Sequence, residues 1–252
     1  MLIVISPSKS IDFKEIGIYK GVGQPRFLKE ADLLMAKLAG FRADEIAERD
    51  KVSIKMALSA YEYIQTFPLE QTAQKEAIFA FSGNVYDKLD AGGLDASALN
   101  FLQKHLCIFS AMYGVLRPLD RIKPYRLDMS SGLIPNLYAF WRDKVTTVVS
   151  QLLKENDYLL INLASVEYFK MMDVKTLPPQ TRIITPVFQQ EIKGKWTTNS
   201  LFAKHARGLM LRFIAENKIT NPERLQSFDA EGYFYNPLLS DTNIWYFQKL
   251  PL

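Results

Sequence analysis

The fold prediction starts from the stretch Ser110-Ala-Met-Tyr-Gly-Val-Leu-Arg-Pro-Leu-Asp-Arg-Ile-Lys-Pro-Tyr-Arg126. The residues just before it carry apolar side chains at helical spacing, and Gly114 can adopt the positive φ that ends a helix at little steric cost. Pro118 lacks a backbone donor and suits the first turn of a new helix. The stretch therefore predicts a helix, a tight turn and a short second helix, which is the outline of a helix-hairpin-helix element.

Four basic side chains follow this turn within ten positions: Arg117, Arg121, Lys123 and Arg126. The backbone N–H groups of such a turn can bind a nucleic-acid phosphate, and basic side chains around it add contacts to the backbone. A typical hairpin of this kind has two glycines flanking an apolar residue, whereas this stretch has Gly114 alone. A helix-loop-helix with solvated arginines is therefore the alternative interpretation.

The composition is typical of a soluble globular protein, with 48% hydrophobic and 23% charged residues in a chain of 252. The formal net charge of +4 permits contact with a polyanion without requiring it. The longest apolar runs are too short to cross a bilayer, and Met1-Leu-Ile-Val-Ile5 lacks the basic region of a signal peptide. We therefore expect a cytoplasmic protein with no membrane contact.

The single cysteine, Cys107, cannot form an internal disulfide, which fits a reducing compartment. Its apolar neighbours indicate an inert core thiol rather than a redox sensor. One cysteine and two histidines cannot assemble the usual zinc or haem ligand sets, and no carboxylate spacing supports another metal site. We expect neither a metal nor a cofactor.

Three short apolar runs predict strands that are buried on both faces: Leu2–Ile5, Ala77–Phe81 and Tyr158–Ile161. Polar side chains follow each run, namely Ser6 and Lys9, then Asn84 and Tyr86, then Asn162, Ser165 and Glu167. Ligands of open α/β sheets bind beyond the carboxyl ends of the strands, so these loops could converge on one crevice. The alternative is that Asn and Ser merely cap helices that follow the strands.

Apolar spacing predicts helices over residues 25–66 with a break at Gly40, near 68–76, from an Asp95 N-cap through 109, and from about 136. A long helix is expected to about Asn217, with Asn199 or Ser200 as its N-cap. A β-hairpin is expected across 182–198, turning at Lys193-Gly194. In the last helix, Lys204 and Arg207 are expected opposite the apolar stripe. With no repeat or linker, the chain predicts one compact α/β domain over residues 1–252, with a mixed sheet, surrounding helices and the helix-hairpin-helix element.

Several stretches occur in a fixed order along nearly the whole chain: Leu2-Ile-Val-Ile-Ser-Pro-Ser-Lys9, Phe81-Ser-Gly-Asn-Val-Tyr86, Tyr113-Gly-Val-Leu-Arg-Pro-Leu-Asp120 with Pro124-Tyr-Arg126, Ile161-Asn-Leu-Ala-Ser165 with Glu167-Tyr-Phe-Lys170, Ala206-Arg-Gly-Leu-Met210, and Glu231-Gly-Tyr-Phe234. As an ordered set they resemble the bacterial YaaA family, which is named for its peroxide-stress resistance protein. The extreme C-terminus, from about Asn236, departs from the pattern.

The resemblance implies a single α/β domain of unusual architecture, with a helix-hairpin-helix in a positively charged cleft. It also implies binding of DNA, with and without unpaired bubbles, and protection from peroxide through lower free intracellular iron. On this sequence the hairpin maps to Tyr113 and Gly114. No cluster of His and carboxylates indicates iron storage, so we expect any effect on iron to be indirect.

The first functional hypothesis is a cytoplasmic DNA-binding protein of the oxidative-stress response. Its expected site residues are Tyr113, Gly114, Arg117, Arg121, Lys123, Arg126, Lys204 and Arg207. Contacts to phosphates rather than base edges would give little sequence preference, and Tyr113 or Tyr125 would stack on an unpaired base.

The second hypothesis is an enzyme that acts on a small nucleotide-like or anionic substrate. Its catalytic candidates are Lys9, Ser165 and Glu167, with Glu167 as acid or base and Lys9 or Lys204 as an anion anchor. The spacing shows no nucleophile–base pair, so it names no reaction. A pocket that holds the three candidates together would favour this hypothesis, and a shallow basic groove would favour DNA. A scaffold or partner-binding protein is the third possibility.

Overall fold

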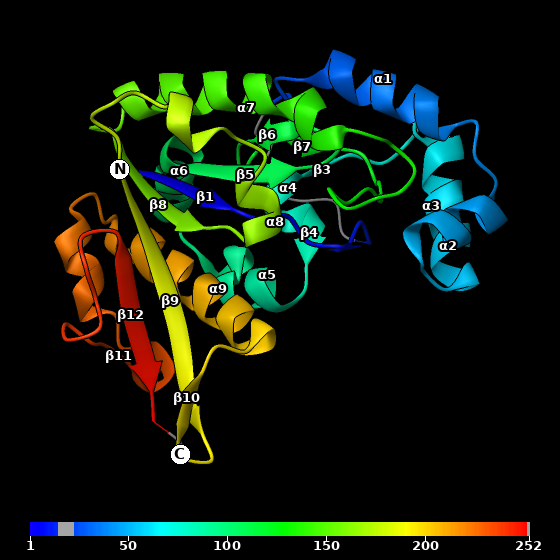
Figure 1. Ribbon diagram of the computed structural model, residues 1–252. Coiled ribbons are helices and arrows are strands. Elements are labelled where there is room, and N and C mark those ends of the chain that lie inside the picture. The colour runs from blue at the N-terminus through cyan, green and yellow to red at the C-terminus, as the bar shows by residue number, and fades with distance from the viewer. Residues whose placement is uncertain (15–22, 251–252) are drawn as a thin grey trace.

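The computed structural model describes residues 1–14 and 23–250 (Figure 1). Eight strands form its main sheet: β1 (Leu2–Ile5), β5 (Leu106–Ser110), β6 (Gly114–Leu116), β8 (Leu159–Leu163), β9 (Arg182–Ile192), β10 (Lys195–Thr197), β11 (Tyr233–Tyr235) and β12 (Ile244–Lys249). Two further two-stranded sheets pair β2 (Ser10–Ile11) with β4 (Phe81–Ser82), and β3 (Lys75–Glu76) with β7 (Arg121–Ile122).

Neighbouring strands of the main sheet follow the order β11-β12-β9-β8-β1-β5-β6, and β10 pairs with β9 outside this path. The five central strands, from β12 to β5, are parallel, whereas β6, β10 and β11 pair antiparallel. The expected α/β class with a mixed sheet is confirmed. The prediction of one domain covers residues 1–252, of which 15–22 and 251–252 lie outside the described part.

Nine α-helices occur in the described residues: α1 (Leu28–Leu38), α2 (Ala43–Asp50), α3 (Ile54–Thr66), α4 (Ala77–Ala80), α5 (Asn84–Leu89), α6 (Ala96–His105), α7 (Leu137–Lys154), α8 (Val166–Phe169) and α9 (Ser200–Asn217). Short 3₁₀ helices are η1 (Ala91–Gly93), η2 (Val174–Thr176), η3 (Pro222–Ser227) and η4 (Ala230–Gly232). Helix α7 lies along one side of the parallel strands, α5 and α9 lie on the other, and α1 to α3 gather at the end remote from β9 and β12 (Figure 1). Within these residues, no helix has both the length and the apolar character needed to cross a membrane.

Strand β1 occupies the middle of the sheet because every one of its side chains is apolar. Each residue of Leu2–Ile5 is at most 1% exposed, with β5 on one side and β8 on the other. A strand buried on both faces reads as a continuous hydrophobic run, and that signal correctly predicted β1 and β8. Because β1 and β8 are parallel neighbours, the polar loops that follow them leave the sheet side by side, at the carboxyl ends of the two strands.

The predicted helix-hairpin-helix is wrong. Helix α6 begins after its Asp95 N-cap as expected but ends at His105, and the next residues form β5, which pairs with β1. The apolar residues of β5 have helical spacing with those of α6, yet the sheet buries all four of them together with Ser110, whereas one face of a helix would bury only some. The stretch around Gly114 is therefore a β-hairpin between β5 and β6.

Ser110 and Gly114 build the turn of this hairpin. The Ser110 hydroxyl accepts the N–H groups of Met112 (3.2 Å) and Tyr113 (3.0 Å), which satisfies the backbone of the turn in place of a helix. Gly114 has the expected positive φ of +67°, but it starts β6 instead of closing a helix. Pro118 is buried and starts no helix.

Of four further predictions from the sequence, a turn and a helix cap are confirmed, and a strand and a helix are wrong. The turn at Lys193-Gly194 connects β9 and β10, and Asn199 caps α9 through a 2.8 Å hydrogen bond. The strand predicted over Ala77–Phe81 is wrong for residues 77–80, which form α4; only Phe81 lies in a strand, β4. A short apolar run fits a buried helix as well as a buried strand. The helix expected near 68–76 is absent from that segment, which ends in β3.

Cys107 is buried as expected, although it lies in strand β5 instead of the predicted helix. Burial raises the pKa of its thiol to about 12. The thiolate is therefore scarce at neutral pH, which makes Cys107 unreactive.

Candidate functional site

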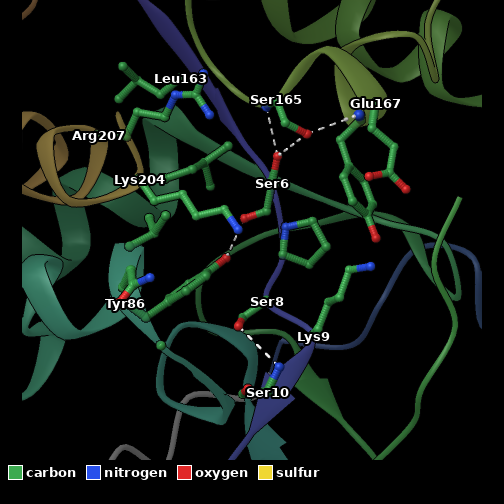
Figure 2. A pocket seen from close by; sticks show the side chains of 16 residues that line it. Ser6, Ser8, Lys9, Ser10, Tyr86, Leu163, Ser165, Glu167, Lys204 and Arg207 are labelled. Carbon is green, nitrogen blue, oxygen red and sulfur yellow. Dashed lines mark hydrogen bonds between the residues drawn. The ribbon is translucent and has the colours of Figure 1, made fainter. Parts of the chain in front are cut away.

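A pocket of about 450 Å³ lies at the carboxyl ends of β1 and β8 (Figure 2). Its walls come from residues 5–10 after β1, residues 83–86 at the start of α5, residues 163–168 after β8, and α9. This volume is within the range of small-ligand sites, and the position is where open α/β sheets bind ligands. Residues of all three polar loops for which a common crevice was one interpretation line this pocket.

The pocket gathers five of the predicted site residues: Lys9, Ser165, Glu167, Lys204 and Arg207. The three catalytic candidates thus lie together with two of the predicted DNA-binding residues. Asn162 is not part of the lining; it is buried, and its side-chain oxygen accepts the N–H of Ala164 at 3.0 Å. The chemical roles of the five residues stay predictions.

Two serine hydroxyls form the floor between β1 and β8. Ser6 Oγ lies 3.1 Å from Ser165 Oγ and accepts the Ser165 N–H at 2.8 Å (Figure 2). Ser165 Oγ also accepts the N–H of Tyr168 at 3.4 Å, as the N-cap of α8. The contact between the hydroxyls uses one of their two protons, so the other is available to a ligand. No histidine or lysine of the described residues hydrogen-bonds to either hydroxyl, so the pair forms no nucleophile–base couple.

Lys9 is held by a carboxylate that the sequence analysis did not identify. Its ammonium lies 3.0 Å from Asp128 Oδ2, and the Lys9 side chain is 59% exposed against 20% for Asp128. Asp128 also accepts the Tyr168 hydroxyl at 3.4 Å. Because Asp128 follows the basic stretch with no motif of its own, only the fold reveals that it neutralises part of the charge of Lys9.

Lys204 and Arg207 are the cations of the opposite wall, one turn apart on α9 (Figure 2). Neither side chain has an ion pair or a hydrogen bond to another described residue. Arg207 is half-buried and lines the pocket. Burial lowers the pKa of Arg207, but a guanidinium titrates so far above neutral pH that it stays charged. A desolvated cation without a carboxylate partner is suited to bind an anion.

Glu167 supplies a carboxylate on the side of Lys9. Its Oε1 atom is buried and receives no hydrogen bond from the described residues. The backbone oxygen of Glu167 accepts the Tyr138 hydroxyl at 3.1 Å, and burial together with the Glu167 charge raises the pKa of Tyr138. Glu167 lines the pocket, and the described residues leave the hydrogen-bonding capacity of this oxygen unused.

Tyr86 fixes the loop after β1. Its ring is 5% exposed, and its hydroxyl donates to the Ser6 carbonyl at 2.9 Å (Figure 2). Burial raises the pKa of Tyr86 well above its ordinary value, so the phenol is a neutral donor at physiological pH. Asn84 is positioned by His205, whose Nε2 lies 3.3 Å from Asn84 Oδ1. The described residues contain no group of three or more His, Cys, Asp or Glu side chains that could hold a metal ion.

No residue of the predicted hairpin lines this pocket, and its turn lies in the core. Tyr113 and Tyr125 are 1% and 5% exposed and contact each other edge to face at 5.4 Å, so their rings are covered by protein. Their hydroxyls bond to the Lys123 N–H and to Ser110. Gly114 is buried against Trp141. Base stacking by either tyrosine would require the core to open.

The four basic side chains after the hairpin have different surroundings. The ammonium of Lys123 donates to the carbonyls of Phe67 (2.6 Å) and Leu69 (3.0 Å), and Arg126 donates to the Lys9 carbonyl at 3.4 Å. Arg121 is exposed on β7, whereas Arg117 is half-buried. These residues do not form one basic cluster around a turn, because the segment runs through the core as strands.

Comparison with known proteins shows the same resemblance over the whole chain. A family model described as "Peroxide stress protein YaaA" matches residues 1–239. A "UPF0246 protein" of Neisseria meningitidis serogroup B is 40% identical over 256 residues, which cover 99% of this chain and 98% of the relative. Similar proteins of Ralstonia nicotianae (41%, covering 99% of each chain) and Tolumonas auensis (41%, covering 99% and 98%) carry the same name.

Proposed function

Because the chain belongs to the peroxide stress protein YaaA family, we propose that it acts in the response to peroxide stress, and that it does so by binding a phosphate-bearing, nucleotide-like ligand in the pocket between β1, β8 and α9. The observation that carries the proposal is the pair Lys204 and Arg207, two cations that line a pocket of ligand size without a partner among the described residues. The available hydroxyl proton of Ser6 and Ser165 adds a neutral donor. Together these groups supply what a phosphate needs, namely positive charge and hydrogen-bond donors.

Removing either cation is expected to weaken phosphate binding about tenfold or more, since a hydrogen bond to a charged group contributes about 1.5 to 3 kcal/mol. The measurement is isothermal titration calorimetry with inorganic phosphate, adenosine 5′-monophosphate and adenosine 5′-diphosphate on wild type, Lys204→Gln and Arg207→Gln. Lys37→Gln is the matched control, because Lys37 is an exposed lysine of α1, outside the pocket. Absence of binding by wild type at millimolar ligand, or equal weakening by the control, would contradict the proposal.

DNA is the second candidate ligand. The observation that favours it is that Lys204, one of the predicted DNA contacts, is exposed at the pocket, while Arg121 is exposed on β7. A phosphate backbone laid across the pocket would reach the same cations as a free nucleotide. The hairpin supplies no helical turn for this contact, so the proposed DNA contact rests on side chains.

Charge reversal tests this second candidate. Fluorescence anisotropy with duplex and bubbled DNA is expected to show log affinity falling with log salt at a slope of about 0.9 per neutralised phosphate on duplex. Lys204→Glu and Arg121→Glu should each flatten that slope and weaken all DNA sequences alike, whereas Lys37→Glu should not. No binding at low salt would exclude DNA. If only one of the two variants loses DNA affinity, the contact lies at the substituted residue, either at the pocket (Lys204) or on β7 (Arg121).

The place of action in this proposal is the cytoplasm, since the single cysteine fits a reducing compartment. A lowering of free iron, which the family resemblance implies, is proposed to be indirect. Iron retained in stoichiometric amount on the purified protein after chelation would contradict that part of the proposal.

A further inference from the structure

We infer that Glu167 makes the pocket bipolar, and that it selects, among phosphate-bearing ligands, those that carry a hydroxyl or amino hydrogen-bond donor away from the phosphate. This inference rests on the proposed function, because it assumes that Lys204 and Arg207 hold the phosphate. The inference adds which chemical groups the ligand carries at the end away from its phosphate.

The two walls of the pocket carry charges of opposite sign. Lys204 and Arg207 extend from α9 on one side, and Glu167 lies on the other with Lys9 below it (Figure 2). Lys9 does not cancel the Glu167 charge, because its ammonium is paired with Asp128 at 3.0 Å. A ligand held by its phosphate against α9 therefore presents its remaining groups to a carboxylate.

Glu167 Oε1, which has no hydrogen-bond donor among the described residues, indicates which chemical group the ligand carries away from its phosphate. Buried carboxylate oxygens normally receive hydrogen bonds, because burying a charged acceptor without a partner is unfavourable. No side chain or backbone N–H of the described residues donates to Oε1. An ionised carboxylate only accepts, so its complement is an O–H or N–H of the ligand, whereas a second phosphate would be repelled.

A folding role does not account for this carboxylate. The described residues give Oε1 neither a hydrogen bond nor an ion pair, and the Glu167 contact with Tyr138 uses the backbone oxygen, which any residue at this position would supply. A buried acceptor that lacks a protein donor costs stability, as groups at ligand sites often do. Replacement of Glu167 by methionine, which has similar length and no carboxylate, is therefore expected to keep or raise the melting temperature of the ligand-free protein.

Paired ligands test the inference directly. Wild type is expected to bind adenosine 5′-monophosphate about tenfold or more tightly than at least one of two analogues, 2′,3′-dideoxyadenosine 5′-monophosphate and purine riboside 5′-monophosphate, which lack the ribose donors and the amino donor. Wild type should also bind adenosine 3′,5′-bisphosphate more weakly than the monophosphate. Glu167→Met should abolish the preference for adenosine 5′-monophosphate over the analogues that lack donors. Glu167→Gln, which removes the charge but keeps an acceptor, should abolish the preference for the monophosphate over the bisphosphate.

The control ligand separates this inference from the function on which it rests. Inorganic phosphate has no second end, so its affinity should be at most slightly changed in both Glu167 variants while Lys204→Gln and Arg207→Gln weaken it. If phosphate binds through α9 but both preferences are absent from wild type or survive in Glu167→Met, the inference is wrong and the phosphate site stands. If phosphate binding does not depend on Lys204 and Arg207, the proposed function itself fails.

Discussion

Replacing Gly114 with alanine is expected to lower the free energy of unfolding by about 4 kcal/mol. A Cβ on Gly114 would lie 2.5 Å and 2.8 Å from two ring carbons of Trp141, and 3.0 Å from Phe27. Trp141 is fully buried, with its indole N–H donating to the Ala111 carbonyl at 2.7 Å, so the ring has little freedom to move. Overpacking costs about 1 to 3 kcal/mol. The positive φ of +67° adds about 1 to 2 kcal/mol for a residue with a Cβ.

Gly194→Ala is the matched control for this experiment. Gly194 has a φ of +76° in the turn between β9 and β10, but a Cβ at this position would have no described neighbour within 4 Å. Gly194→Ala should therefore lower the free energy of unfolding only through the positive φ, by about 1 kcal/mol. Urea unfolding followed by circular dichroism compares the two variants. Equal losses would show that the Trp141 contact contributes nothing and would contradict our explanation of the hairpin.

Replacing Gly208 with alanine is expected to destabilise the protein by about 3 kcal/mol, although alanine favours helices over glycine by about 1 kcal/mol. Helix α9 packs on α5 so closely that a Cβ on Gly208 would lie 2.2 Å from the Val85 carbonyl oxygen and 2.8 Å from Lys88 Cβ. The backbone oxygen cannot rotate away, so the helices must separate. Arg207 is the adjacent residue, and its displacement should weaken phosphate binding as well.

Gly92→Ala serves as the control for Gly208. A Cβ on Gly92 meets no described atom within 4 Å, so its effect should be within about 0.5 kcal/mol. Thermal unfolding and phosphate titration calorimetry are measured on both variants. A neutral or stabilising effect of Gly208→Ala would show that helix propensity outweighs the contact, and that α9 and α5 are free to adjust.

Local sequence patterns were sufficient where one segment determined its own structure. The apolar run Leu2–Ile5 was predicted as a buried strand because four consecutive apolar residues of β-rich character are typical of a strand covered on both faces. The turn at Lys193-Gly194 and the Asn199 cap of α9 depend on neighbouring residues only, and both are present. The crevice followed from the general rule that parallel strands end at one edge of a sheet.

The same patterns failed where the outcome depended on distant partners. Residues 106–109 have helical spacing with α6, but hydrogen bonds to β1, far earlier in the chain, make them a strand. The cations after the hairpin were grouped by sequence distance, whereas the fold directs Lys123 to the carbonyls of Phe67 and Leu69. Short apolar runs are ambiguous between helix and strand until a pairing partner is known.

The sequence by itself determined the α/β class and the buried strand β1, and it raised the hypothesis that Lys9, Ser165 and Glu167 share one crevice. Only the tertiary structure decided that Lys204 and Arg207 complete the opposite wall, that Asp128 pairs with Lys9 and that an oxygen of Glu167 has no donor among the described residues. The physical reason is that a run of apolar side chains is driven into the core by its own hydrophobicity, whichever segments it packs against. Charge pairing and desolvation are set by neighbours from other segments, which no local pattern records.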